Sequence, residues 1–145
     1  MSEIRYENFF PIEGGTFVNA GDVSSRIKSI LKNLGIGSEV VRRAAIIAYE
    51  SEINIVSYAL RGNIRLSVTP DAVCIEAKDE GPGIPDIELA MQEGFSTATP
   101  MVREMGFGAG MGLSNIKKFS DSLEITSEVG QGTHVKTRIN MAEAG

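Results

Sequence analysis

Two stretches in the first half of the chain carry hydrophobic residues at intervals of three and four, the spacing of one helix face. The first runs over 23–34, with Asp22 or Ser24 placed as its N-cap and Gly35 at its end. The second runs from about 39 to 60 and is hydrophobic around most of its circumference, so a largely buried helix is expected there. Shorter helices are expected over 86–91 and 113–120.

Elsewhere hydrophobic and polar residues alternate, which is typical of strands with one buried face. Strands are expected over 4–12, 16–18, 64–69, 72–78, 123–129 and 133–141. Gly14-Gly15, Pro70-Asp71 and Gly130-Gln131-Gly132 are placed to turn three hairpins. Strands that are mostly antiparallel, with helices clustered between them, predict an α+β two-layer sandwich rather than a doubly wound sheet.

Composition narrows the class of the molecule. The 145 residues suit one domain over 1–145, and the hydrophobic and charged fractions are those of a globular protein. A net charge of −5 argues against nucleic acid as a non-specific partner. No hydrophobic run approaches the roughly 20 residues that cross a bilayer, and no secretory signal pattern is present. We therefore expect a cytoplasmic protein without a membrane partner.

Cysteine and histidine each occur once. Cys74 has no partner for an internal disulfide, and with one cysteine and one histidine a zinc site is disfavoured. Cys74 is expected to be a small buried residue of its strand. The alternation of its strand places His134 opposite Val135, so His134 is expected to face solvent.

Four glycines stand on alternate positions over 106–112, directly before the periodic stretch 113–119. Such a loop lets backbone amides approach a ligand, and the helix after it offers its N-terminus to an anion, although a flexible surface loop has the same composition. The G-x-G-x-x-G fingerprint, the P-loop and the protein-kinase motifs are all absent. A second constellation, Asp79-Glu80-Gly81-Pro82-Gly83-Ile84-Pro85, follows a hydrophobic strand.

The long helix carries a polar stripe. Glu50 and Asn54 are four residues apart, and Ser57 and Arg61 continue the same face. Polar side chains on a buried helix need partners. Glu50 and Asn54 either satisfy loop backbones or an arginine, or they face a metal ion and phosphates.

Three motifs stand in order: Glu50-Ser51-Glu52-Ile53-Asn54, then Asp79-Glu80-Gly81-Pro82-Gly83, then the glycine run 106–112. Together with Gly132-Thr133 they resemble the N, G1, G2 and G3 boxes of the GHKL ATPase superfamily, over about residues 20 to 141. The resemblance implies a Bergerat-type ATP-binding fold, a two-layer α/β sandwich whose mixed, mostly antiparallel sheet has helices on one face.

The resemblance also implies roles for individual residues. Asp79 accepts the adenine amino proton, Thr133 touches the base, and Asn54 supplies an oxygen to Mg²⁺. Glu50 is the general base, in preference to Glu52, which points about 160° from Asn54 on the helical wheel. The implied ATP contacts are Asn54, Asp79, Gly81, Gly83, Ile84, Gly106, Gly108, Gly110, Met111, Gly112, Leu113 and Thr133. A mobile lid is expected over 94–112.

Two subgroups of the superfamily are especially similar to this chain. Its short length resembles bacterial anti-sigma factor serine kinases, and segments 54–59 and 94–97 resemble the switch serine/threonine kinases of partner-switching pathways. Anti-sigma kinases usually have histidine where this chain has Tyr58. The resemblance implies an ATP-dependent protein serine/threonine kinase that phosphorylates a STAS-domain antagonist protein. Two alternatives stay open: an ATP-binding regulator that sequesters a sigma factor or another target, and an ATPase without a protein acceptor. A homodimer is also left open.

Overall fold

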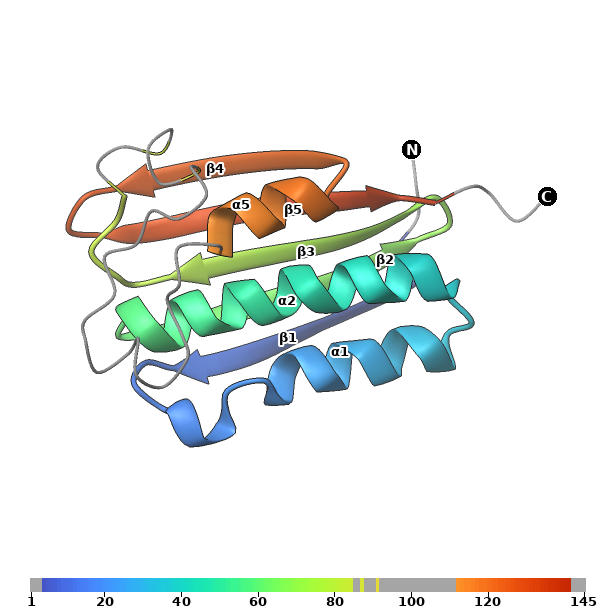
Figure 1. Ribbon diagram of the computed structural model, residues 1–145, viewed down its shortest axis with the longest axis horizontal. Coiled ribbons are helices and arrows are strands. Elements are labelled where there is room, and N and C mark those ends of the chain that lie inside the picture. The colour runs from blue at the N-terminus through green and yellow to red at the C-terminus, as the bar shows by residue number, and fades with distance from the viewer. Residues whose placement is uncertain (1–3, 85–86, 88–90, 92–111, 142–145) are drawn as a thin grey trace.

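The computed structural model describes residues 4–84, 87, 91 and 112–141. Along the described part of the chain, one strand is followed by helices, then by two strands, one helix and two further strands (Figure 1). The elements are β1 (Tyr6–Glu13), a short 3-10 helix η1 (Phe17–Asn19), α1 (Asp22–Asn33), α2 (Ser38–Tyr58), β2 (Arg61–Thr69), β3 (Ala72–Asp79), α5 (Gly112–Phe119), β4 (Ser122–Glu128) and β5 (Gly132–Asn140). The short helix expected over 86–91 lies largely outside the described residues.

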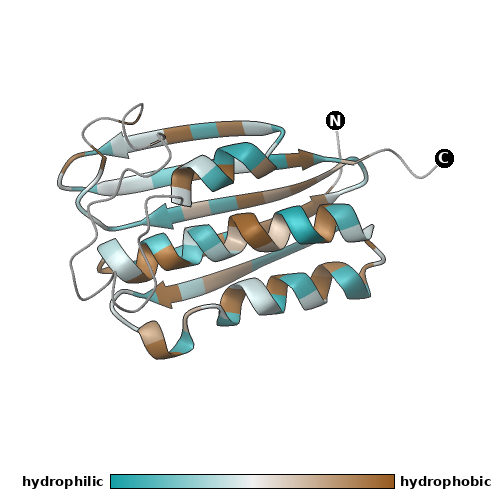
Figure 2. Ribbon diagram, viewed as in Figure 1, coloured by the Kyte–Doolittle hydropathy of each residue, from teal (hydrophilic) through white to brown (hydrophobic). Residues whose placement is uncertain are grey.

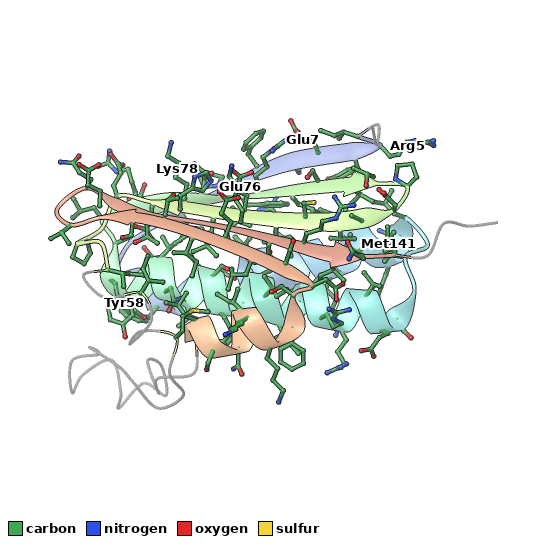
Figure 3. All side chains as sticks on the ribbon, turned by 90° about the horizontal axis from the view of Figure 1, so that it is seen from above. Arg5, Glu7, Tyr58, Glu76, Lys78 and Met141 are labelled. Carbon is green, nitrogen blue, oxygen red and sulfur yellow. The ribbon has the colours of Figure 1, made fainter. Side chains whose placement is uncertain are left out.

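The strands form a five-stranded sheet in the order β1-β2-β3-β5-β4. Each neighbouring pair is antiparallel, so the described sheet is antiparallel throughout rather than mixed. Helices α1, α2 and α5 cover one face of it (Figure 1), and the edge-on view shows one layer of strands over one layer of helices (Figure 3). The predicted α+β two-layer sandwich with helices on one face is confirmed.

The core fills the layer between the sheet and the helices, where hydrophobic and polar stretches alternate along each element (Figure 2). The buried residues of this core are Phe10, Ile12, Ile64, Leu66, Val68, Val73, Ile75, Ala77, Val135 and Ile139 from the strands, and Val23, Ile27, Leu31, Val41, Ala44, Ile47, Ala48, Ile55, Val56 and Ile116 from the helices. Full burial of one large hydrophobic side chain contributes about 1.5–3 kcal/mol. This layer therefore holds α2, α5 and the end of β3 in a fixed relation. None of the described helices is long and apolar enough to cross a bilayer.

The segment after β1 was predicted wrongly. It forms the helix η1 instead of the second strand of a hairpin. The backbone N–H of Gly14 donates to the Leu60 carbonyl (2.9 Å), and that of Gly15 donates to the Val56 carbonyl (2.7 Å). A Cβ at Gly14 would lie 1.8 Å from the Ala59 carbonyl oxygen, so only glycine fits. The chain is thus fastened to the end of α2 and does not fold back on β1.

The start of α1 is also capped differently from the prediction. Gly21 is the N-cap residue, in a left-handed conformation, and no side chain of the first turn caps the helix. Instead Glu52 of α2, which is 2% exposed, accepts hydrogen bonds from the backbone N–H groups of Val23 (3.1 Å) and Ser24 (3.0 Å). A carboxylate at a helix N-terminus satisfies free donors and suits the helix dipole. Glu52 therefore joins α2 to α1 and faces away from Asn54, as the helical wheel predicts.

The sheet face opposite the helices is polar and partly exposed; Glu7, Glu76 and Lys78 project from it in Figure 3. His134 lies on this face, as its alternation predicts, but its ring nitrogen contacts Glu76 instead of being fully solvated. Burial raises the pKa of Glu76, but hydrogen bonds from His134 and Arg65 outweigh it and lower that pKa below its usual value. Cys74 also lies on this face and is only partly buried, because the core faces the helices.

Candidate active site

The polar stripe of α2 faces α5. Asn115 Nδ2 donates a hydrogen bond to Glu50 Oε1 at 3.3 Å. Gly112, the first residue of α5, lies so close to Asn54 that a Cβ there would be 3.0 Å from Asn54 Oδ1. The first turn of α5 therefore touches both Glu50 and Asn54. Within the described part of the chain, no arginine forms a salt bridge with Glu50.

Three contacts hold α5 and the chain just after it in this position. Ile116 is 1% exposed and belongs to the hydrophobic core, and the Arg43 Nε group of α2 donates to the Phe119 carbonyl at 2.9 Å. The guanidinium of Arg43 also forms a salt bridge with Asp121 (3.1 Å). Because the middle of α5 is packed in the core and its C-terminal end is held against α2, Gly112 and Asn115 keep a defined position beside the polar stripe.

Glu50 is half-buried, and burial raises the pKa of its carboxyl group, while the hydrogen bond from Asn115 lowers it. Desolvation disfavours the ionised form, whereas a donor to the carboxylate favours it. Burial dominates, so Glu50 holds a proton more tightly than an exposed glutamate does. A carboxyl group tuned in this way suits proton transfer near neutral pH. Glu52, the competitor for this role, is occupied as the cap of α1.

A second group of residues gathers at the end of β3. Asp79 is the last residue of that strand, and its Oδ1 accepts a hydrogen bond from the Thr133 backbone N–H at 3.2 Å. Burial raises the pKa of Asp79, and backbone hydrogen bonds from Thr133 and Gly81 lower it. A Cβ at Gly81 would lie 3.0 Å from Asp79 Oδ1 and 3.3 Å from the Cα atom of Ala59. The chain after β3 therefore passes directly between this carboxylate and the end of α2.

The segment that follows Gly81 is fastened to the turn between β4 and β5. Gly83 has a φ of +78°, and a Cβ there would lie 2.5 Å from the Glu128 carbonyl oxygen. The Ile84 N–H donates to Ser127 Oγ (2.7 Å), and Ser127 Oγ lies 3.0 Å from Thr133 Oγ1. Ile84 and Thr133, both predicted site residues, thus share one contact network with Asp79.

The two groups lie at different points along α2. Asn54 precedes Ala59 by five residues, which is about 7.5 Å along a helix axis. Leu113 packs on the hydrophobic core, so its side chain serves packing. Gly106, Gly108, Gly110 and Met111, and the lid expected over 94–112 except Gly112, lie outside the described residues.

Sequence reasoning missed two residues of the site. Ser127 links Ile84 to Thr133, and Asn115 contacts Glu50. Ser127 has the same alternation as the inward-facing Ile125, and Asn115 lies three residues after Gly112 on a predicted helix. These positions were visible in the sequence, but their partners come from distant segments.

Comparisons with known proteins show a family match and several similar proteins. Residues 39–143 match the family described as histidine kinase-, DNA gyrase B- and HSP90-like ATPases. A relative named serine/threonine-protein kinase RsbT, from Bacillus subtilis, is 34% identical over 75% of this chain and 79% of its own length. An anti-sigma F factor from Caldanaerobacter subterraneus subsp. tengcongensis is 39% identical over 68% of this chain, which spans 62% of that relative.

The similarity extends over nearly the whole chain in another relative. An anti-sigma F factor from Heyndrickxia coagulans is 30% identical over 95% of this chain and 86% of its own length. The motif order, the two-layer fold and the family match point to the same superfamily. The chain belongs to the family of histidine kinase-, DNA gyrase B- and HSP90-like ATPases.

Proposed function

We propose that the protein is an ATP-dependent protein serine/threonine kinase of a bacterial partner-switching pathway, and that it phosphorylates a STAS-domain antagonist protein. The observation that carries this proposal is the placement of Glu50 and Asn54 side by side against the first turn of α5. The relative named as a serine/threonine-protein kinase supports the reaction class. Both ATP and the proposed pathway belong to the cytoplasm.

Asp79 fits the adenine base. Its carboxylate stands at a strand end, half-buried, and is held by backbone donors from Thr133 and Gly81. A carboxylate has four acceptor sites, so it retains capacity for the amino group of adenine. Gly81 and Gly83 carry no side chain, so the backbone can approach a bound base closely, and neighbouring atoms leave no room for a Cβ at either position.

Asn54 fits Mg²⁺ and the phosphates. It offers a neutral oxygen, and Mg²⁺ is held by few protein ligands together with phosphate oxygens and water. Gly112 brings the N-terminus of the eight-residue helix α5 against Asn54, and that end of a helix favours negative charge. When bound, Mg²⁺ would neutralise charge on the phosphates. A nucleotide with its base at Asp79 and its phosphates at Asn54 would lie along the C-terminal part of α2.

Glu50 suits the role of the general base. Its carboxylate orients the serine or threonine hydroxyl of the acceptor and takes the hydroxyl proton, while that oxygen bonds to the terminal phosphorus and ADP leaves. The raised pKa of Glu50 makes it a better proton acceptor than an exposed glutamate, provided that it is ionised. Nucleotide binding and proton transfer are thus assigned to different residues.

A second function is favoured by the names of several relatives, which are anti-sigma F factors. In that case the protein sequesters a sigma factor or another target, and ATP is a structural ligand. The kinase reaction requires Glu50 as a proton acceptor beside the phosphates, whereas sequestration of a target requires no proton acceptor there.

The variant Glu50→Gln separates the two functions. Glutamine keeps the size of the side chain but accepts a proton poorly, so we expect ATP affinity within a few fold of wild type while phosphate transfer falls by about 10²-fold or more. Calorimetry measures the affinity, and transfer to candidate STAS-domain proteins measures the reaction. Glu39→Gln is the matched control, since Glu39 is an exposed glutamate of the same helix. Transfer by Glu50→Gln at a near wild-type rate contradicts the assignment.

A further inference from the structure

We propose that Asn115 is a positioning residue, which holds one oxygen of the Glu50 carboxylate and leaves the other for the acceptor hydroxyl. The inference rests on the proposed function of Glu50 as the base. Neither the family motifs nor the pattern of the sequence singles out Asn115. The structure indicates this role, because the side-chain amide of Asn115 donates a hydrogen bond to Glu50 Oε1 at 3.3 Å.

The position of Asn115 in the fold suits this role. It lies one helical turn after Gly112, which abuts Asn54, so the same turn of α5 meets both polar residues of α2. The next residue, Ile116, is anchored in the core, and Arg43 ties the end of α5 to α2. The amide of Asn115 is therefore presented to Glu50 by a rigid element, which is what precise orientation of a catalytic group requires.

The electrostatics of Glu50 support the same conclusion. Burial raises the pKa of Glu50, and the hydrogen bond from Asn115 opposes that rise. Within the described part of the chain, Asn115 supplies the one side-chain hydrogen bond to Glu50. An amide N–H makes a stronger hydrogen bond to a carboxylate oxygen than to the carbonyl oxygen of a carboxylic acid, so the contact favours the ionised form, which accepts a proton.

A purely structural role for Asn115 makes a different prediction. If the contact only stabilised the packing of α5 on α2, its loss would lower the free energy of unfolding and leave the pH dependence of transfer unchanged. A positioning role instead moves the acidic limb of the pH–rate profile of kcat, since that limb reports ionisation of the base in the bound state.

The test compares Asn115→Asp and Asn115→Ala with wild type and with Lys117→Ala, an exposed position of the same helix. Aspartate keeps the shape of asparagine but places a negative charge beside Glu50, and alanine removes the donor. We expect the acidic limb to move to higher pH by about one unit in Asn115→Asp, less in Asn115→Ala, and not in the control. The affinity of Asn115→Ala for ATP, measured by calorimetry, should stay within a few fold of wild type, whereas the added charge of Asn115→Asp lies in the turn of α5 that meets Asn54 and should weaken ATP binding further.

A second readout does not depend on activity. The side-chain carboxyl of Glu50 can be titrated by NMR in carbon-labelled protein without ligand, with Glu50→Gln to assign the signal. We expect its midpoint to rise in both Asn115 variants. An unmoved midpoint together with an unmoved acidic limb overturns the positioning role. If wild type transfers no phosphate at all, the proposed function fails, and the titration alone decides whether Asn115 holds the carboxylate.

Discussion

Replacing Asp79 by asparagine exchanges one acceptor for a donor at the end of β3. In the structure the carboxylate accepts hydrogen bonds from the backbone of Thr133 (3.2 Å) and of Gly81. The oxygen of asparagine would stay with these donors, so its NH₂ group would point to the place that the proposal gives to adenine. The amino group of adenine is also a donor, and two donors then face each other.

The size of the effect follows from the cost of an unmade hydrogen bond. Leaving a buried donor without a partner costs about 1–3 kcal/mol, more where a charged partner is lost. At 1.4 kcal/mol for each factor of ten, this corresponds to a Kd for ATP that is about 5- to 150-fold weaker. The fold itself should not suffer, because burial raises the pKa of Asp79 and a neutral side chain avoids that cost.

Calorimetry with two nucleotides makes the test specific. Inosine triphosphate carries a carbonyl acceptor where ATP carries the amino group. Wild type should prefer ATP, whereas Asp79→Asn should lose this preference or reverse it, because its NH₂ group can donate to the carbonyl. Glu80→Gln is the control, since the adjacent Glu80 side chain is 65% exposed. Equal affinity of wild type and Asp79→Asn for ATP, with both proteins folded, refutes the adenine assignment.

Three further predictions concern α2. Glu52→Ala removes the cap of α1 and should lower the free energy of unfolding by about 1–2 kcal/mol. The variant Glu52→Gln tests the choice of base: if this variant folds but transfers no phosphate, Glu50 is not the base. Ser57 has a buried hydroxyl without a hydrogen-bond partner in the described structure. Ser57→Ala should therefore raise the free energy of unfolding of the ligand-free protein by about 1 kcal/mol, measured by urea titration. A lower free energy of unfolding would contradict this reasoning. The native state binds the Glu50 proton more tightly than the unfolded state. Stability should therefore fall as the pH rises from the ordinary glutamate range through the raised pKa of Glu50, and Glu50→Gln should lessen that fall in unfolding curves measured at several pH values.

Local periodicity was enough to predict which residues share a face. Glu50 and Asn54 lie together because a helix repeats every 3.6 residues, and Glu52 lies apart from them for the same reason. The alternation of β5 likewise predicted that Val135 enters the core and His134 does not, but Cys74, which was expected to be buried, lies on the opposite face of the sheet. These features depend only on the geometry of one element.

The features that the sequence did not reveal depend on contacts between distant segments. The cap of α1 comes from a glutamate 29 residues away from Val23, and the partner of Glu50 lies 65 residues further along the chain. The segment 16–18 has strand-like residues, but backbone hydrogen bonds from Gly14 and Gly15 to the end of α2 direct it elsewhere. No local pattern encodes such partners.

The central claim is tested most directly by incubating the wild-type protein with Mg-ATP and purified STAS-domain proteins, and weighing each acceptor by intact-mass spectrometry. The account predicts the addition of one phosphoryl group to a serine or threonine of one acceptor, in the presence of wild type and not of Glu50→Gln. If wild-type protein binds ATP, and yet every candidate acceptor keeps its original mass, the result contradicts the kinase assignment.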